Sequence, residues 1–492
     1  MEKSQLDTLE HIDTIIIGAG VSGISAGHHV SQHPNLSFAI FERRDAIGGT
    51  WDLFRYPGIR SDSDMYTFGF NFRPWTKGKT LASGSDIREY VTQTAAEAGI
   101  DQKIRFGHSI TKAVWSSSDR LWHLTVEIKD KKNPCEITCN FLFCCSGYYN
   151  YTHGYLPKFK GYYDYNGLIV HPQSWPEDLE YTGKNILVIG SGATAVTIVP
   201  AMTDKAEHVT MLQRSPTYIA SQPEVDKIAL WFRRLLPAKL AYHLSRIKNI
   251  LFTLYIYNLS HRKPKMMKKF FVNMAKKTLG PDIDAKHFTP DYNPWQQRLC
   301  AIPDNDLFNV MREGKASIIT DHIDTFTSKG VKLQSGQEIE ADIIIPATGL
   351  EVQFFGGMEL WLDDKKVNTG DLLNYKGMMF SNIPNFAATF GYTNSSWTLK
   401  ADLTSDYIAK LLSYMQKHDY DQVVPFYEEG SQQLEDMLDF KSGYIERAKS
   451  ITPKKGSKSP WCNKHNYISD FFAIKFAKFN DGVLKFSNKA EP

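Results

Sequence analysis

Two glycine-rich loops, each directly after an apolar run typical of a buried strand, constrain the fold of this chain more than any other feature. The first, GAGVSG, occupies residues 18–23, and the second, GSGATA, occupies residues 190–195. In a strand–loop–helix unit, such a loop lets a pyrophosphate approach the backbone and places it at the positive end of a helix dipole. Two of them predict an α/β chain with two dinucleotide sites; the alternative is a pair of turns that bind nothing.

The first loop has the context that a site for FAD or NAD requires. An apolar run at residues 14–17 precedes it, residues 26–30 can continue a helix, and the next apolar run, 39–41, ends in Glu42. Glu42 can accept hydrogen bonds from a ribose diol and would repel a 2′-phosphate, so this site suits FAD or NAD rather than NADP. The residues of this loop predicted to contact the cofactor are Gly18, Gly20, Ser22 and Gly23.

The strand predicted after the second loop does not end in a carboxylate, unlike the strand that ends in Glu42 after the first loop. The second loop follows the apolar run 185–189, and the run 209–212 ends in Gln213, Arg214 and Ser215 without a carboxylate. A guanidinium at this position can pair with a phosphate, so the sequence predicts NADPH here. The predicted contact residues are Gly190, Ser191, Gly192, Ala193, Thr194, Ala195, Arg214 and Ser215.

Two further apolar segments, 141–147 and 342–349, each end in a small residue, a hydroxyl residue and glycine, as the closing strands of two dinucleotide domains would. The fold expected is therefore α/β, with two nested Rossmann-like domains and a helical insertion. The expected division is an FAD-binding domain over 1–150 and 350–492 with a C-terminal loop, a linker and NADP-binding domain over 151–215 and 296–349, and the insertion over 216–295.

The composition is that of a globular enzyme: of 492 residues, 42% are hydrophobic and 23% are charged. Six cysteines follow neither a zinc pattern nor a disulfide framework, so we expect free thiols and no bound metal. Residues 1–11 lack the apolar core of a secretory signal, which predicts a cytoplasmic protein. We expect no nucleic-acid partner. Residues 454–460 are predicted to form a mobile surface loop.

The charge of the insertion is asymmetric. Residues 227–277 hold thirteen Lys or Arg and no Asp or Glu, although the net charge of the whole chain is only +3. The apolar run 250–257 inside this stretch is too short to span a bilayer. Two interpretations are open: a basic, aromatic surface that contacts an anionic membrane from the cytoplasmic side, or a solvated helical insertion whose apolar face packs on the core.

Between the two loops, residues 165–176 read YNGLIVHPQSWP. This segment closely resembles the Phe-x-Gly-x-x-x-His-x-x-x-Trp-Pro fingerprint of type I Baeyer–Villiger monooxygenases, with Tyr165 in place of the phenylalanine. The segments 48–52, 55–62 and 347–349 also match that family, and the similarity covers most of the chain. The residues in these segments that the resemblance places at the cofactors are Gly49, Thr50, Trp51, Asp52, Arg60, Ser61 and Asp62.

The resemblance implies an enzyme in which NADPH reduces FAD and O2 forms a peroxyflavin that attacks a ketone, giving an ester or lactone. Such chemistry needs a fixed cation in a dry pocket to stabilise developing negative charge. Arg298 occupies the position of the family's catalytic arginine, and Asp62 that of the carboxylate that orients it. Gln297 replaces a lysine that often helps to hold the 2′-phosphate, which leaves Arg214 and Ser215 to recognise NADPH.

The substrates expected are hydrophobic ketones, with oxidation of thioethers or thioamides as a side activity; the oligomeric state stays open. The rival functions are a flavin monooxygenase that oxidises nitrogen or sulfur, an FAD and NADPH disulfide reductase, and a non-catalytic binding protein at a membrane. His171 is either a general base or a fastener of the linker between domains. Trp461 either folds over NADP or anchors a loop on the surface.

Overall fold

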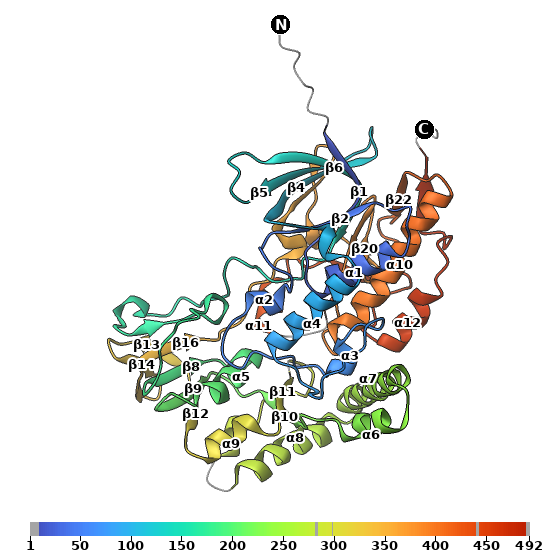
Figure 1. The fold of residues 1–492 in the computed structure, drawn as a ribbon. Coiled ribbons are helices and arrows are strands. Elements are labelled where there is room, and N and C mark those ends of the chain that lie inside the picture. The colour runs from blue at the N-terminus through green and yellow to red at the C-terminus, as the bar shows by residue number, and fades with distance from the viewer. Residues whose placement is uncertain (1–8, 281–283, 298, 439–441, 489–492) are drawn as a thin grey trace.

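The first glycine-rich loop begins at the end of a central strand of an eleven-stranded sheet (Figure 1). The computed structural model of the protein describes residues 9–280, 284–297, 299–438 and 442–488. In this sheet, β1 (Glu10–Ile17) pairs in parallel with β2 (Phe38–Glu42) and with β6 (Cys135–Cys144). The apolar runs predicted at 14–17 and 39–41 form the C-terminal half of β1 and the buried centre of β2, since strands covered on both faces are continuously apolar.

The sheet is completed by segments from both ends of the chain. Its order is β18-β17-β4-β5-β6-β1-β2-β3, with β21 pairing on the C-terminal half of β6 and β20 and β19 following. Residues after 349 therefore return to the sheet that holds the first loop. The other strands are β3 (Ile104–Phe106), β4 (His108–Ser116), β5 (Leu121–Ile128), β17 (Glu359–Leu362), β18 (Lys365–Lys366), β19 (Asn374–Tyr375), β20 (Met379–Phe380) and β21 (Phe386–Ala388).

The second loop belongs to a separate five-stranded parallel sheet of order β12-β9-β8-β16-β7. The loop follows β8, and α5 begins within it, at Ala193. A three-stranded antiparallel sheet, β13-β14-β15, covers part of this unit. The elements are β7 (Leu168–Ile169), β8 (Asn185–Ile189), α5 (Ala193–Met202), β9 (His208–Gln213), α9 (Asp306–Arg312), β12 (Ala316–Thr320), β13 (Ile323–Phe326), β14 (Gly330–Leu333), β15 (Glu338–Glu340) and β16 (Ile343–Pro346).

The expected insertion is helical. In the sequence its helices lie between two short strands, β10 (Tyr218–Gln222) and β11 (Leu299–Pro303), which pair with each other in parallel. Figure 1 shows its helices together at the lower end of the molecule, away from the first sheet. They are α6 (Lys227–Leu235), α7 (Ala238–Arg262) and α8 (Pro264–Leu279), with a short turn η4 (Ala285–Phe288). Among the described helices, we find none whose length and apolar content would let it cross a bilayer.

The remaining helices pack around the first sheet, with α1 lying against α10. The C-terminal part adds two small antiparallel ladders, β22 with β25 and β23 with β24. The bounds are α1 (Val21–Ser31), α2 (Thr50–Leu53), α3 (Met65–Phe68), α4 (Gly84–Glu97), η1 (Asp101–Lys103), η2 (Tyr162–Asp164), η3 (Pro172–Ser174), η5 (Phe354–Gly357), η6 (Thr369–Asp371), α10 (Trp397–Lys417), β22 (Gln422–Pro425), β23 (Leu434–Asp436), α11 (Gly443–Arg447), β24 (Lys454–Gly456), α12 (Tyr467–Lys475) and β25 (Leu484–Ser487).

The prediction that residues 454–460 form a surface loop was wrong for residues 454–456, whereas 457–460 form a turn in which 457–459 are exposed. Residues 454–456 form β24, which pairs with β23, and the side chain of Lys455 is buried. Acidic partners on the paired strand accommodate the lysines: Lys454 Nζ lies 2.9 Å from Asp436 Oδ1. The indole of Trp461 is buried between the rings of Tyr375 and Tyr427, so it is not a surface anchor. The basic composition of the segment concealed its pairing with an acidic strand.

Candidate active site

The first glycine-rich loop leaves no room for larger residues at two positions. Gly18 has a φ of +97°, and a Cβ there would lie 2.9 Å from the carbonyl oxygen of Cys145. A Cβ on Gly23, in the first turn of α1, would lie 1.8 Å from the carbonyl oxygen of Gly18. The turn from β1 into α1 is therefore folded tightly on itself, with the N-terminus of α1 pointing into the space beside it.

Glu42 ends β2 beside this loop, as the sequence predicts. Its carboxylate accepts hydrogen bonds from the backbone N–H of Ala19, at 2.7 Å, and of Arg44, at 2.8 Å. Burial raises the pKa of Glu42, and these two N–H donors oppose that rise because they favour the charged form. A buried acceptor is thus held next to the loop, where a ribose hydroxyl can reach it.

A cavity of about 280 Å³ opens beside the first loop, and residues from both glycine-rich loops line it. The structure brings twelve of the predicted site residues to its wall. They are Gly18, Gly20, Ser22, Glu42, Gly49, Thr50, Trp51, Arg60, Ser61, Asp62, Ala193 and Thr194. Asp62 is exposed at this wall. Arg298 lies outside the described residues, and Ala301, three positions later on β11, lines the cavity.

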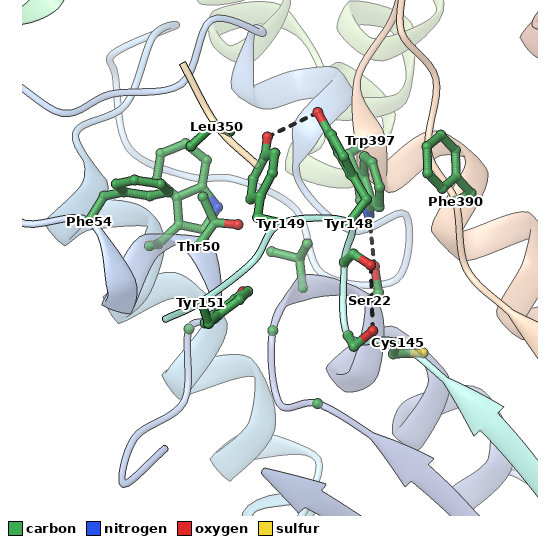
Figure 2. A pocket seen from close by; sticks show the side chains of 18 of the residues that line it. Ser22, Thr50, Phe54, Cys145, Tyr148, Tyr149, Tyr151, Leu350, Phe390 and Trp397 are labelled. Carbon is green, nitrogen blue, oxygen red and sulfur yellow. Dashed lines mark hydrogen bonds between the residues drawn. The ribbon is translucent and has the colours of Figure 1, made fainter. Parts of the chain in front are cut away.

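An aromatic wall that the sequence reasoning missed forms one side of the cavity (Figure 2). The indole of Trp397 stacks on the ring of Tyr148, with centroids 5.4 Å apart, and its Nε1–H donates to Ser22 Oγ at 2.8 Å. The hydroxyl of Tyr149 donates to that of Tyr148 at 3.0 Å. Tyr148 and Tyr149 directly follow the segment 141–147, which the sequence predicts as the end of a closing strand, and this position was the available signal.

Asp52 forms ion pairs next to the segment that carries Gly49, Thr50 and Trp51. It is buried and forms ion pairs with Arg44, at 2.8 Å, Arg55, at 2.6 Å, and Arg88, at 3.4 Å. Within the described part of the chain, Asp52 is not among the residues that line the cavity. The geometry indicates that this carboxylate orders the segment that carries Gly49, Thr50 and Trp51 rather than meeting a ligand itself.

Arg60 bridges the two halves of the molecule. Its Nη1 donates to Oδ2 of Asp306, the first residue of α9, at 2.6 Å. Burial raises the pKa of Asp306, and the nearby guanidinium of Arg60 opposes that rise. The Nη2 atom of Arg60 is buried, and none of the described residues offers it a hydrogen-bond acceptor. Arg60 itself lines the cavity that both loops share, so its positive charge lies at the wall of that cavity.

The second loop faces the same cavity from the other side. Ala193 and Thr194, at the start of α5, line it, whereas Gly190 and Ser191 form the preceding turn and Ala195 is buried in the helix. A Cβ placed on Gly192 would have no atom of the described chain within 4 Å, so there is open space above this backbone. Arg214 and Ser215 are exposed at the end of β9, whose Leu212 is the register partner of Ile189 on β8.

These features fit the two dinucleotides that the sequence predicts. The first loop offers a helix N-terminus together with the buried acceptor Glu42, and the second offers a helix N-terminus together with the exposed guanidinium of Arg214. Arg60 places a positive charge at the cavity wall, and the open space above Gly192 leaves room for a bound anionic group. The described residues could therefore hold both groups with their reacting ends in one cavity.

The fingerprint segment 165–176 packs away from the cavity wall in the described structure. The ring of His171 lies so close to the chain that a Cβ on Gly154 would be 2.1 Å from its Cε1, and burial lowers the pKa of His171. Its Nδ1 accepts the N–H of Gln173, whose side chain in turn donates to the carbonyl of Asn150 at 2.8 Å. This geometry favours the interpretation that His171 holds the linker between the domains in place over the one in which it is a general base.

Comparison with known proteins gives consistent matches. Residues 79–390 match the family model described as flavin-binding monooxygenase-like, and residues 16–77 match an NAD(P)-binding Rossmann-like domain. The chain is 50% identical to the FAD-containing monooxygenase EthA of Mycobacterium tuberculosis, over 98% of this chain and 99% of that one. It is 48% identical to the probable FAD-binding monooxygenase AlmA of Acinetobacter baylyi, over 98% and 97%.

Solved structures share the fold at low sequence identity. A crystal structure of OTEMO in complex with FAD and NADP superposes with a TM-score of 0.74 at 18% identity, covering 98% of this chain and all of the other. An oxidised steroid monooxygenase bound to NADP gives a TM-score of 0.77 at 18% identity, covering 97% and 100%. The chain thus shares its overall fold with those proteins.

Proposed function

The chain belongs to the flavin-binding monooxygenase-like family, and from that premise we propose that it is a Baeyer–Villiger monooxygenase that inserts one oxygen atom of O2 into hydrophobic ketones. It is a flavin monooxygenase that uses FAD and NADPH. The observation that carries the proposal is the single cavity lined from both glycine-rich loops, because hydride transfer requires the two cofactors to meet. The fingerprint over 165–176 separates this reaction from plain nitrogen or sulfur oxidation.

In this proposal, the cofactors when bound would supply hydride transfer and O2 activation, and the residues of the chain would bind and orient them and shield the cavity from water. The first loop and Glu42 hold the FAD pyrophosphate and ribose, and Asp52 keeps the neighbouring segment in place through its three arginines. The stacked rings of Trp397 and Tyr148 exclude water from one side of the cavity. Arg60 ties the two halves together through Asp306 and places its positive charge at the cavity wall.

Arg298 and Asp62 carry the proposed chemistry at the ketone. Negative charge develops on the carbonyl oxygen during attack, and a guanidinium stabilises it without giving up its proton. Asp62, which lines the cavity, would orient Arg298 by a charge-assisted hydrogen bond. The support for both roles is the match of these residues to the family's motif and the position of Ala301 at the cavity wall.

The domain division proposed from the sequence follows the two sheets. FAD would be bound by 1–150 with 350–492, and NADPH by 151–215 with 296–349, with 216–295 inserted in the second unit. The pairing of β21 on β6 and of β16 on β8 supports this division. We also place the protein in the cytoplasm, which the free state of all six cysteines supports.

Gly192→Ala tests the second nucleotide site without disturbing the fold. The backbone of Gly192 has an ordinary φ of −81°, and a Cβ there would meet only open space, so the variant should fold normally. A bound pyrophosphate would collide with that Cβ. We expect the KM for NADPH to rise at least about fivefold, which corresponds to about 1 kcal/mol of steric conflict, with FAD content unchanged.

The matched control is Gly78→Ala, since Gly78 also has open space at its Cβ position and no positive φ but lies far from both loops in the sequence. It should leave the steady-state kinetics unchanged. An unchanged KM for NADPH in Gly192→Ala would contradict the placement of the nucleotide above this loop.

The substrate class is tested by measuring products rather than NADPH consumption alone. Purified FAD-loaded enzyme is incubated with a panel of linear, cyclic and aryl ketones and of thioethers and thioamides, and esters, lactones and S-oxides are quantified against NADPH consumed. We expect esters or lactones from apolar ketones because the cavity wall is aromatic, with sulfur oxidation as a minor activity. S-oxides or N-oxides without any ester would favour the rival class of flavin monooxygenase.

A further inference from the structure

The helical insertion carries a second apolar face, which points away from the core. On α6, Ile228, Trp231 and Leu235 recur at helical spacing, and Trp231 and Leu235 are 57% and 61% exposed. On α7, exposed apolar side chains recur in the same way. They are Leu240, Ile247, Leu251, Phe252 and Tyr255. Because α6 packs against α7, these two rows belong to one helical pair.

The opposite face of α7 is already used by the core. Arg246 is fully buried and donates to the backbone carbonyls of Tyr66 and Gly69, at 2.8 and 2.6 Å. Ile250 and Leu254 pack in a cluster with Tyr392 and Leu399. The helix is therefore fixed to the body of the molecule through its inner face, and the exposed row is additional apolar surface that folding leaves in solvent.

The charged residues within the stretch 227–277 all have one sign. The stretch 227–277 has no acidic residue, and most of its cations are exposed. The exposed cations are Lys227, Arg233, Arg234, Lys239, Arg262, Lys263, Lys265, Lys269, Lys276 and Lys277. A second copy of this chain docked on the same face would bring two such sets together, and their repulsion opposes a homodimer here. An anionic lipid surface has the complementary charge and accepts apolar side chains below its headgroups.

The surface continues toward the C-terminal helix. Tyr467, the first residue of α12, packs against the cluster that contains Ile250 and Leu254 of α7. Phe472 in α12 and Phe476, the residue that follows α12, stack on each other and are both strongly exposed. Figure 1 shows α12 close to the end of α7, on the same side of the molecule. Exposed aromatic residues at the edge of a basic surface are typical of contact with the interfacial layer of a membrane.

We propose that α6 and α7, with α12 at their edge, form a docking surface for anionic membranes. The inner face of α7 contacts the segment that leads to the cavity: Asn249 Nδ2 donates to Asp64 Oδ1 at 2.8 Å, and Asp64 caps α3. Phe68, at the end of α3, lines the cavity. Docking thus brings the bilayer close to the wall of the cavity, and a lipophilic substrate dissolved in the membrane is within reach of the site.

The test uses the FAD-loaded, full-length enzyme and sedimentation with vesicles of phosphatidylcholine alone or with phosphatidylglycerol. We expect binding to the anionic vesicles at low salt and release as salt rises, because the attraction fades over a Debye length of about 8 Å at 0.15 M. The double substitution Arg234→Glu/Lys239→Glu should lower the partition coefficient at least about 30-fold, since each cation near an anionic surface contributes roughly fivefold. Trp231→Ser/Leu235→Ser should lower it as well.

Lys131→Glu/Lys132→Glu serves as the matched control, because these two exposed lysines lie in the turn between β5 and β6 of the first sheet. This variant should bind anionic vesicles like the parent, and all variants should retain FAD and oxidise NADPH. Equal binding by the parent and the α6–α7 variants overturns the proposal. Failure of the parent to bind anionic vesicles at low salt also overturns the proposal. So does the finding that the parent binds no vesicles but forms a dimer, and that the Trp231→Ser/Leu235→Ser variant abolishes this dimer.

Discussion

Arg298→Ala is expected to lower ester formation by about 100- to 1000-fold while FAD stays bound, because only the step that places negative charge on the ketone oxygen loses its cation. NADPH oxidation should continue, with hydrogen peroxide as the product in place of ester. The measurement is the ratio of ester to NADPH consumed, together with a peroxide assay and the flavin absorbance spectrum. Ala301, on the strand that begins one residue after position 298, lines the cavity, which is consistent with a role of Arg298 there.

Arg298→Lys is the informative companion, since an ammonium keeps the charge but loses the planar, bidentate geometry. It should recover part of the ester yield if charge is what the step requires. Because Asp62 is proposed to orient this arginine, Asp62→Asn should also reduce ester yield, by less than Arg298→Ala. Ester yield near that of the parent in Arg298→Ala would exclude the catalytic role.

The second large effect is expected for Arg214→Ala, in the preference between the two nicotinamide cofactors. A charge-assisted pair between this exposed guanidinium and a 2′-phosphate contributes about 1.5 to 3 kcal/mol, so the KM for NADPH should rise roughly 10- to 150-fold. NADH has no 2′-phosphate, and its KM should change little. The measurement is steady-state kinetics with both cofactors at a saturating ketone concentration.

Arg312→Ala is a suitable control because Arg312 is an exposed arginine at the end of α9, beside the same sheet. It should leave the ratio of the two KM values unchanged. A proportional rise for NADPH and NADH in Arg214→Ala would show that the residue acts on the shared part of the cofactor, and the assignment of the 2′-phosphate to Arg214 would then fail.

The sequence allowed the central strands to be predicted well, for a physical reason. The run 185–189 coincides with β8, and 209–212 lies within β9, because a strand buried on both faces by helices must be apolar throughout. The edges of the first sheet could not be found in this way. Strands such as β18 and β19 are two residues long and carry charged or polar residues, so they leave no periodic signal.

The sequence allowed the glycine-rich loops of the candidate site to be predicted, but not the aromatic residues that line the cavity. A glycine-rich turn is a local pattern, whereas the contact of Trp397 with Ser22 joins residues 375 positions apart and depends on how α10 packs on α1. Two neighbouring residues that the sequence places at the cofactors also have different roles in the structure. Trp51 lines the cavity, but Asp52 forms ion pairs with three arginines. The prediction identified the segment, and only the fold decided which side chains face the cavity.

The two interpretations of the insertion stayed open for a related reason. The run 250–257 is apolar, but a helix distributes it over two faces: Ile250 and Leu254 pack inward, while Leu251, Phe252 and Tyr255 are exposed. A continuous apolar stretch contains both sets and cannot show which one the core will cover. The structure shows that the core uses one of these faces and leaves the other exposed.

The pairing of β21 with β6 has a consequence for the order of events on the ribosome. The C-terminal half of β6 gains its neighbour only when residues 386–388 have been made, about 240 residues later, or roughly 10 to 50 s at ordinary rates of synthesis. The second parallel sheet is complete once residue 346 has emerged. The second sheet, whose synthesis begins later, is thus completed first. The first sheet meanwhile keeps an unpaired strand edge, which can pair incorrectly with other strands. Limited proteolysis of stalled nascent chains ending near residue 380 would show a protected second sheet and a cleavable β6.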